Sequence, residues 1–171
     1  MTVGTAEIGY ALNEPASPSY SLAGQTDVIV DVSGWFTDGS SAAGSAGLFT
    51  GLTPARILDS RNGTGGWSLP LAPNSPRSFV VAGHGGVPAM RDAHPPTAVV
   101  LNVTVTDTTA PSFLSVWPDS GPRPGSSDLN WVGGVTIPNL VVVKLGSSGA
   151  IDLYNLSGQT DVVVDVVGYY Q

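Results

Sequence analysis

The stretch Gly158-Gln-Thr-Asp-Val-Val-Val-Asp-Val-Val-Gly168 decides the fold, because its side chains alternate along the chain. A period of two with β-branched residues is typical of a half-buried strand. The face expected in the core consists of Val162, Val164 and Val166. Asp161 and Asp165 are expected on the opposite, exposed face, about 13 Å apart at the rise of a strand. That separation is too large for the two carboxylates to bind one metal ion directly.

The same stretch occurs a second time in the chain. Residues 24–34 read Gly-Gln-Thr-Asp-Val-Ile-Val-Asp-Val-Ser-Gly, and at an offset of 134 (158 − 24) nine of the eleven positions are identical. Residues 1–37 are therefore interpreted as the C-terminal portion of a preceding repeat, with three strands. Residues 38–47 are rich in glycine, serine and alanine and are expected to be a linker. A complete repeat is expected at 48–171.

The complete repeat alternates between short apolar segments and turns. Its clearest strand is expected at 97–107, with Val99, Leu101, Val103 and Val105 facing inward and their neighbours outward. Other strands are expected at 77–82, 112–117, 129–131, 140–145, 151–154 and 161–167, and Gly146–Gly149 reads as a hairpin turn. The sequence thus predicts an all-β antiparallel sandwich with Greek-key or jelly-roll connections. A closed β-barrel and a β-trefoil are the alternatives.

Charge and composition exclude several classes of function. Thirteen acidic and six basic residues give a net charge of −7 without a basic cluster, so neither nucleic acid nor membrane insertion is expected. The absence of cysteine excludes disulfides, thiolate chemistry and cysteine-bound zinc. Met1–Glu7 lacks the basic start and apolar centre of a secretion signal, so for a secreted protein we expect the signal sequence upstream of this fragment.

The residue types needed for catalysis are sparse. The chain has two histidines, His84 in a glycine-rich turn and His94 in a proline-rich loop, and its glutamates are Glu7 and Glu14. Paired carboxylates of the glycosidase type are therefore not indicated in the complete repeat, and no nucleophile elbow lies between a strand and a helix. We expect no enzyme and no catalytic residues.

Two arginines surround one aspartate after the linker. In an extended chain Asp59 and Arg61 lie on the same side, so the segment from Arg56 to Arg61 is expected to form a partly buried ion pair that fixes the loop at 62–66. The prediction is structural.

Three aromatic side chains are candidates for ligand binding. In the strand register above, Phe113, Trp117 and Tyr154 point away from the core, and aromatic faces of this kind hold sugar rings in β-sandwich modules. Trp117 and Tyr154 are then expected to be more exposed than their inward neighbours. In the alternative interpretation, this second face packs beneath a loop or against the next repeat.

Calcium is the one cofactor considered. Asp107, Asp119, Asp128 and Asp152 lie near turns, and extracellular repeat proteins bind calcium with such carboxylates. The chain lacks an Asp-x-Asp-x-Asp run, so no metal-binding residues are assigned.

Several motifs, taken in order, carry a resemblance. They are Leu52-Thr-Pro-Ala-Arg-Ile-Leu-Asp-Ser-Arg-Asn-Gly63, Gly85-Gly-Val-Pro88, Leu101-Asn-Val-Thr-Val-Thr106, Leu114-Ser-Val-Trp-Pro118, Pro138-Asn-Leu-Val-Val-Val-Lys144 and the closing segment 158–170. Together they resemble the tandem β-rich repeat modules of large secreted and cell-surface proteins of actinobacteria, which are sometimes appended to cell-wall amidases and other hydrolases. The resemblance implies an extracellular location and a non-catalytic accessory or adhesive role.

Two functions follow as hypotheses. In the first, the chain is a structural repeat of a cell-surface stalk, sheath or filament whose partners are other copies. The incomplete first copy would then be completed by a neighbouring molecule in a head-to-tail homopolymer. The alternatives are that it is completed within the chain, or that the chain is a fragment cut from a longer tandem array. The strand expected to accept the neighbour contains Asp27, Val28, Val30, Asp31 and Val32. In the second, the chain is an adhesion module that binds carbohydrate or cell wall and is appended to a secreted enzyme.

Overall fold

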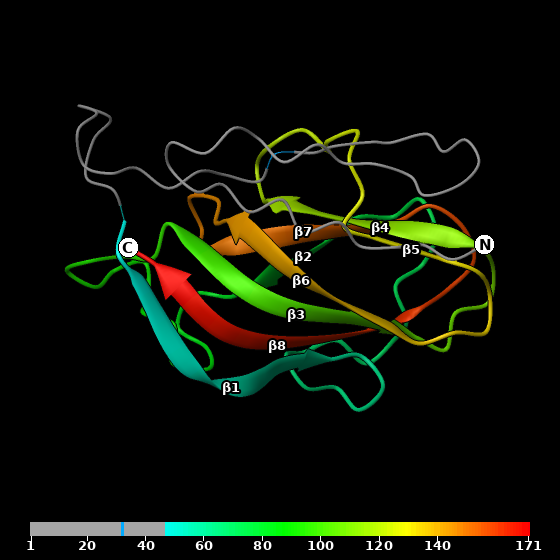
Figure 1. Cartoon of the computed structure of the whole chain (residues 1–171), viewed down its shortest axis with the longest axis horizontal. Coiled ribbons are helices and arrows are strands. Elements are labelled where there is room, and N and C mark those ends of the chain that lie inside the picture. The colour runs from blue at the N-terminus through cyan, green and yellow to red at the C-terminus, as the bar shows by residue number, and fades with distance from the viewer. Residues whose placement is uncertain (1–31, 33–46) are drawn as a thin grey trace, which may run out of the picture. The chain divides into compact units, whose positions relative to one another are not determined.

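The computed structural model describes residue 32 and residues 47–171, and these residues contain eight strands and no helix (Figure 1). The strands are β1 (Phe49–Asp59), β2 (Arg77–Val80), β3 (Ala98–Thr106), β4 (Ser112–Pro118), β5 (Leu129–Trp131), β6 (Ile137–Lys144), β7 (Ala150–Asn155) and β8 (Asp161–Tyr170). The described part of the chain has no helical segment of membrane-spanning length and hydrophobicity.

The strands form two four-stranded antiparallel sheets, ordered β1-β8-β3-β6 and β2-β7-β4-β5. Only the connection from β4 to β5 stays within one sheet, and every other connection crosses to the opposite sheet. This order is that of an eight-stranded jelly roll, a sandwich built from two Greek keys. The predicted sandwich is therefore confirmed, and the described strands form neither a closed barrel nor a trefoil.

β8 occupies the centre of the first sheet and pairs with β1 on one side and β3 on the other. Its inward valines at 162, 164 and 166 are fully buried, as predicted. The predicted inward face of β3 at 99, 101, 103 and 105 is fully buried as well. The period-two pattern thus gives the correct register for both central strands, and a register error of one residue would have exchanged their faces.

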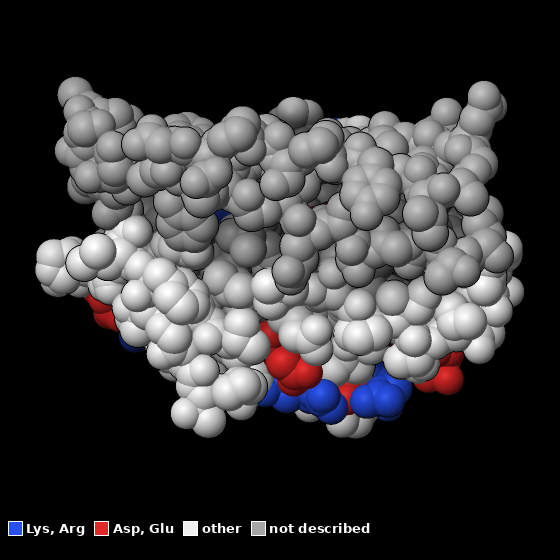
Figure 2. Space-filling view, in the orientation of Figure 1, with Lys and Arg blue, Asp and Glu red and all other residues white. Residues whose placement is uncertain are grey.

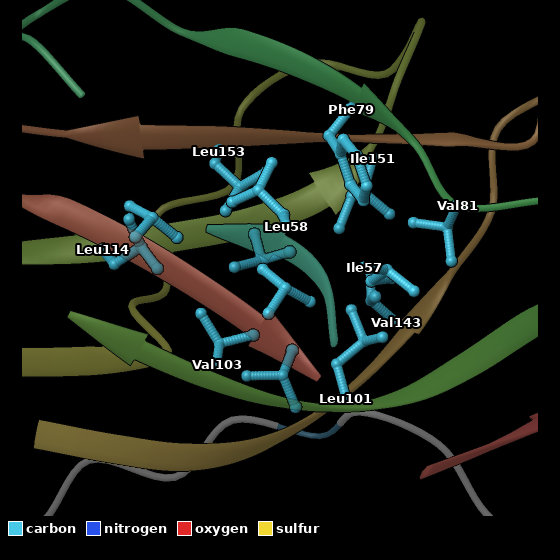
Figure 3. Packing of buried hydrophobic residues seen from close by; sticks show 14 of the residues in the cluster. Ile57, Leu58, Phe79, Val81, Leu101, Val103, Leu114, Val143, Ile151 and Leu153 are labelled. Carbon is cyan, nitrogen blue, oxygen red and sulfur yellow. The ribbon is translucent and has the colours of Figure 1, made fainter. Parts of the chain in front are cut away.

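The core lies between the two sheets. Figure 3 shows Leu101 and Val103 of β3 pointing into the space between the sheets, where Ile151 and Leu153 of β7 also lie. Burying one such aliphatic side chain contributes about 1.5–3 kcal/mol. Leu101, Ile151 and Leu153 are fully buried, so facing central strands account for much of the packing.

Two residues expected on an outer face are buried. Val163 of β8 is 4% exposed and Val100 of β3 is 8% exposed. Both belong to strands that have a neighbouring strand on each side. A side chain in the middle of a sheet loses surface to the side chains on both sides of it, even on the face that points away from the core. Alternation therefore predicts the direction of these residues correctly and their exposure incorrectly.

The turn at Gly146–Gly149 differs from its prediction in what it connects. It is tight, with the Gly149 N–H donating to the Gly146 carbonyl at 2.9 Å. However, it joins β6 and β7, which lie in different sheets, so it is not a hairpin. Turn residues predict a reversal of the chain, but they do not specify whether the next strand pairs with the previous one.

Both ends of the complete repeat lie at one end of the sandwich, here called the proximal pole. The Gln171 N–H donates to the Leu48 carbonyl at 3.3 Å, and Phe49 pairs with Tyr170. In Figure 1 the start of β1 lies beside the C-terminus. The opposite end, the distal pole, is formed by the loops at 60–76, 107–111, 132–136 and 156–160.

The core of the described region is confined to one stretch of sequence. Its buried members run from Ile57 to Tyr169. We expect residues 48–171 expressed alone to unfold cooperatively, as a β protein, in calorimetry and in denaturant titration followed by circular dichroism. A molten or aggregated product would show that residues 1–47 supply part of the core.

Substitutions at two glycines with positive φ allow the cost of backbone strain to be measured apart from the cost of overpacking. A Cβ added to Gly63 (φ +84°) would meet no heavy atom within 4 Å, whereas a Cβ on Gly85 (φ +60°) would lie 2.6 Å from Val166 Cγ1 and 2.7 Å from Ile57 Cγ2. Gly63→Ala should cost about 1 kcal/mol of unfolding free energy for the backbone alone. Gly85→Ala should cost about 1–3 kcal/mol more, because its methyl group overpacks the core. Urea titration measures both, and equal losses would contradict the packing at Gly85.

Candidate functional site

The densest charged cluster in the described region lies where β1 ends. The Asp59 carboxylate is 1% exposed. Its Oδ1 accepts from Arg61 Nε at 2.9 Å and from the Arg61 backbone N–H at 3.1 Å, and its Oδ2 accepts from Arg61 Nη2 at 2.7 Å. The predicted ion pair is confirmed. The loop that follows is bound to the same residue, because the N–H groups of Asn62 and Gly63 donate to the Asp59 backbone carbonyl at 3.3 and 3.1 Å.

Arg56 extends the cluster from β1 to β8. Its Nε and Nη2 donate to the two carboxylate oxygens of Asp165 at 2.9 and 3.2 Å, and its Nη1 lies 3.4 Å from Asp59 Oδ2. Paired donors on paired acceptors give the strongest and most directional form of ion pair. Figure 2 shows blue and red atoms side by side along the lower margin of the described surface, the side on which β1 lies in Figure 1.

Ser60 makes a third connection between the same two strands. Its Oγ donates to Asp161 Oδ1 at 2.6 Å and accepts from the Val162 N–H at 2.9 Å. The Ser60 N–H donates to the Val162 carbonyl at 3.0 Å. Neither this contact nor the pairing of Arg56 with Asp165 was predicted from the sequence. The recurrence of both aspartates in the first copy was the one feature that could have indicated them.

The cluster keeps its charges at ordinary pH. The hydrogen bonds from Arg61 lower the pKa of Asp59 to about 2, against the effect of burial. The same contact raises the pKa of Arg61, and the hydrogen bond to Asp165 raises that of Arg56. A general acid or base needs a pKa near the working pH. These groups are therefore suited to holding strands together rather than to transferring protons.

The aspartates considered for calcium bind separate protein partners. Asp119 accepts from Ser148, Asp152 accepts from Ser78, and Asp128 accepts from the Val116 N–H at 2.7 Å. Within the part of the chain that the structure describes, no group of three or more histidine, aspartate or glutamate side chains could hold a metal ion. Asp107, the fourth, is exposed at the distal pole with φ +52°. The expectation of no cofactor, with calcium as the alternative, stays a prediction.

The aromatic side chains are less exposed than predicted. Trp117 is 5% exposed, below the 6% of Val116 and Trp131, so the expected order of exposure is wrong for Trp117. Tyr154 is 7% exposed, which keeps the expected order, but the side chain is buried all the same. Phe113 is half-buried, and its ring centroid lies 6.1 Å from that of Tyr154.

The loop between β4 and β5 explains this burial. Trp117 Nε1 donates to the carbonyl of Gly121 at 3.1 Å, and the Arg123 guanidinium lies 4.2 Å over the Tyr154 ring. The face that was predicted to bind sugars thus packs beneath a loop, as in the alternative interpretation. Alternation assigned these residues to the outer face of their sheet, but it contains no information about what covers that face.

Two other features lie apart from the cluster. The His84 ring centroid lies 6.3 Å from that of Phe79. The Arg77 guanidinium lies 3.9 Å over the ring of Trp67. This cation–π contact was not predicted, because an irregular segment separates Trp67 from the start of β2.

The predicted assembly strand falls almost entirely outside the described residues. Asp27, Val28, Val30 and Asp31 are not described, and Val32 is exposed. The role of this strand in assembly stays a prediction.

Comparison with known proteins gives no assignment. No model of a known family matches the chain, and no match was found among curated proteins.

The pKa of Asp59 predicts how stability depends on pH. Its folded value of about 2 is below the ordinary value of 3.8, so its ion pairs stabilise the fold above pH 4, and this contribution is lost as the pH falls toward 2. The shift corresponds to at most about 2 kcal/mol, because the arginines are half in solvent. Asp59→Asn should lower the unfolding free energy at pH 7, and the difference from wild type should shrink toward pH 2. Asp165→Asn, in a more exposed pair, is the control and should lose less.

Denaturant titrations at several pH values measure both variants. A difference between wild type and Asp59→Asn that stays constant down to pH 2 would contradict the assignment of the ionised, arginine-bound form to Asp59.

Proposed function

We propose that the chain is a non-enzymatic structural repeat module of a cell-surface stalk, sheath or filament, and that its partners are other copies of the same repeat. One observation carries the proposal. The residues that recur between 24–34 and 158–168 are those through which β8 binds the other strands of its sandwich. The correspondence includes residues that contact β1 and residues that contact β3.

Three recurring residues of β8 contact β1 or the residue after it. Asp161 accepts from Ser60, and Asp165 binds Arg56. A Cβ on Gly168 would lie 2.4 Å from Phe49 Cε2, so only glycine leaves room for that ring. The equivalent residues in the first copy are Asp27, Asp31 and Gly34.

Recurring residues also contact β3 and the loop after it. Thr160 is fully buried, and its Oγ1 donates to the Thr106 carbonyl at 3.0 Å. Gly158 has φ +63°, and a Cβ there would lie 2.7 Å from Ala110 Cβ. The three inward valines recur as Val28, Val30 and Val32. Of the two positions that differ, Val163 lies on the outward face, and Val167 is half-buried at the point where the pairing of β8 with β1 and β3 shifts register.

The first copy thus retains the residues with which a β8 binds a β1 and a β3. The β1 motif Thr-Pro-Ala-Arg-Ile-Leu-Asp-Ser-Arg occurs once in the chain, at 53–61. Strands supplied by another copy would complete the first one by strand addition. Because the donor and acceptor surfaces differ, the contact would be heterologous and would propagate into a filament.

Location outside the cell and the absence of catalysis rest on other grounds. The location follows from the resemblance of the motifs to actinobacterial surface repeats. The lack of catalysis is supported by the charged cluster, whose groups are paired with one another. Carbohydrate binding is not favoured, since Trp117 and Tyr154 are covered by the β4–β5 loop.

The proposal predicts assembly that depends on the first copy. In sedimentation velocity, residues 1–171 should form oligomers that grow with concentration, and residues 48–171 should remain monomeric. Val30→Asp places a charge at the position equivalent to the fully buried Val164 and should weaken association by about a hundredfold or more. Ser33→Asp, at the position equivalent to Val167, which is half-buried and not part of the core cluster, is the matched control and should assemble normally.

A protein of residues 1–171 that stays monomeric at every concentration would overturn the filament. Titration with peptidoglycan fragments and polysaccharides tests the adhesion alternative in the same samples. Saturable binding by a monomer would favour that alternative.

A further inference from the structure

The positions of the first and last residues of the complete repeat determine how successive repeats can be connected. We infer that a tandem array of this module is not an end-to-end thread: successive modules are joined through their proximal poles, and the distal pole of each module stays free of its covalent neighbours. This inference rests on the proposed function, because it concerns an array of such repeats.

The proximal pole holds the first and last residues of the repeat together. The Thr97 N–H donates to the Tyr170 carbonyl at 2.7 Å, and the Gln171 N–H donates to the Leu48 carbonyl at 3.3 Å. The rings of Phe49 and Tyr170 lie 5.2 Å apart. A chain that enters this module at Leu48 therefore leaves it beside the same point.

The two strands that lead to this pole are joined along most of their length. β1 and β8 pair from Phe49 opposite Tyr170 to Asp59 opposite Val163. The ion pair between Arg56 and Asp165 lies between these ends. Separating the points where the chain enters and leaves would require breaking this pairing, so they stay together while the module is folded.

The distal pole is closed by contacts among its own loops. The Leu71 N–H donates to the Thr160 carbonyl at 2.8 Å, and the Thr109 N–H donates to the Gln159 carbonyl at 3.0 Å. The Gly134 N–H donates to the Thr108 carbonyl at 2.7 Å, which ties the β5–β6 loop to the β3–β4 loop. Every described connection at this pole therefore begins and ends within the module.

The length of the linker decides between the possible arrangements. β8 has ten residues and spans about 33 Å, so the poles are separated by roughly that distance. The linker expected at 38–47 also has ten residues, and a chain of that length reaches at most about 33–36 Å. Stacking one module on the distal pole of the previous one would require an almost fully extended linker along its side. Joining two proximal poles requires no extension.

The free pole has a mixed surface. Arg61 and Asp107 are exposed there, and so are three apolar side chains on three different loops, Leu69, Val132 and Leu156. In an array connected at the proximal poles, every repeat presents this surface. An end-to-end thread would instead cover it with the next module.

Distances between spin labels test the arrangement in a chain in which residues 1–171 are followed directly by a second copy of 38–171. The protein has no cysteine, so labels attach only where cysteine is introduced. One sample carries Ser147→Cys, at the exposed turn of the proximal pole, in both complete modules. The other carries Val132→Cys, at the exposed distal pole, in the first module and Ser147→Cys in the second.

We expect the mean distance between the two proximal labels to be the shorter of the two, by about 10 Å or more, given a separation of roughly 33 Å between the poles. A shorter distance from the distal label to the following proximal label would overturn the inference. Thermal unfolding of each labelled chain, matched to the unlabelled one, shows that the modules remain folded. Dilution of the labelled chain into an excess of unlabelled chain confines the measured distances to labels within one molecule. A monomeric chain would then refute the filament, and the order of the two distances would still test this inference.

Discussion

The sandwich depends on β8 being bound on three sides at once. Its edges pair with β1 and β3, and its inward valines fill the centre of the core. β8 is also the last strand of the repeat. The first sheet is therefore complete only when this strand inserts between β1, the first strand of the repeat, and β3. Contacts this distant in sequence carry a large loop-closure cost, which the packing of a central strand must offset.

The sequence predicts this strand well because the side chains that alternate as valines are also the ones that are buried in the core. Val162, Val164 and Val166 face the core, and period-two valines have no other stable placement. The ion pair between Asp59 and Arg61 was predictable for a similar reason, since two residues separated by one position in an extended chain share a side. Local geometry decided both cases.

Predictions were wrong or incomplete where the outcome depends on a distant part of the chain. Gly146–Gly149 is a turn, but the sheet that β7 joins is set by pairing with β2 and β4. Trp117 points outward from its sheet as expected, yet the loop carrying Gly121 covers it. The partners of Asp161 and Asp165 lie about a hundred residues away, on the segment that ends β1. Periodicity carries no information about such contacts.

Native-state hydrogen exchange measures the dependence of the fold on β8 most directly. If β8 is the strand on which the sandwich depends, the amides of residues 162–166 should exchange only through global unfolding, with opening free energies equal to that of the whole module. The first residues of β1, which are largely exposed and pair on one edge, should open at lower free energy. Exchange of the β8 amides by local opening, as fast as that of the edge strands, would contradict the account.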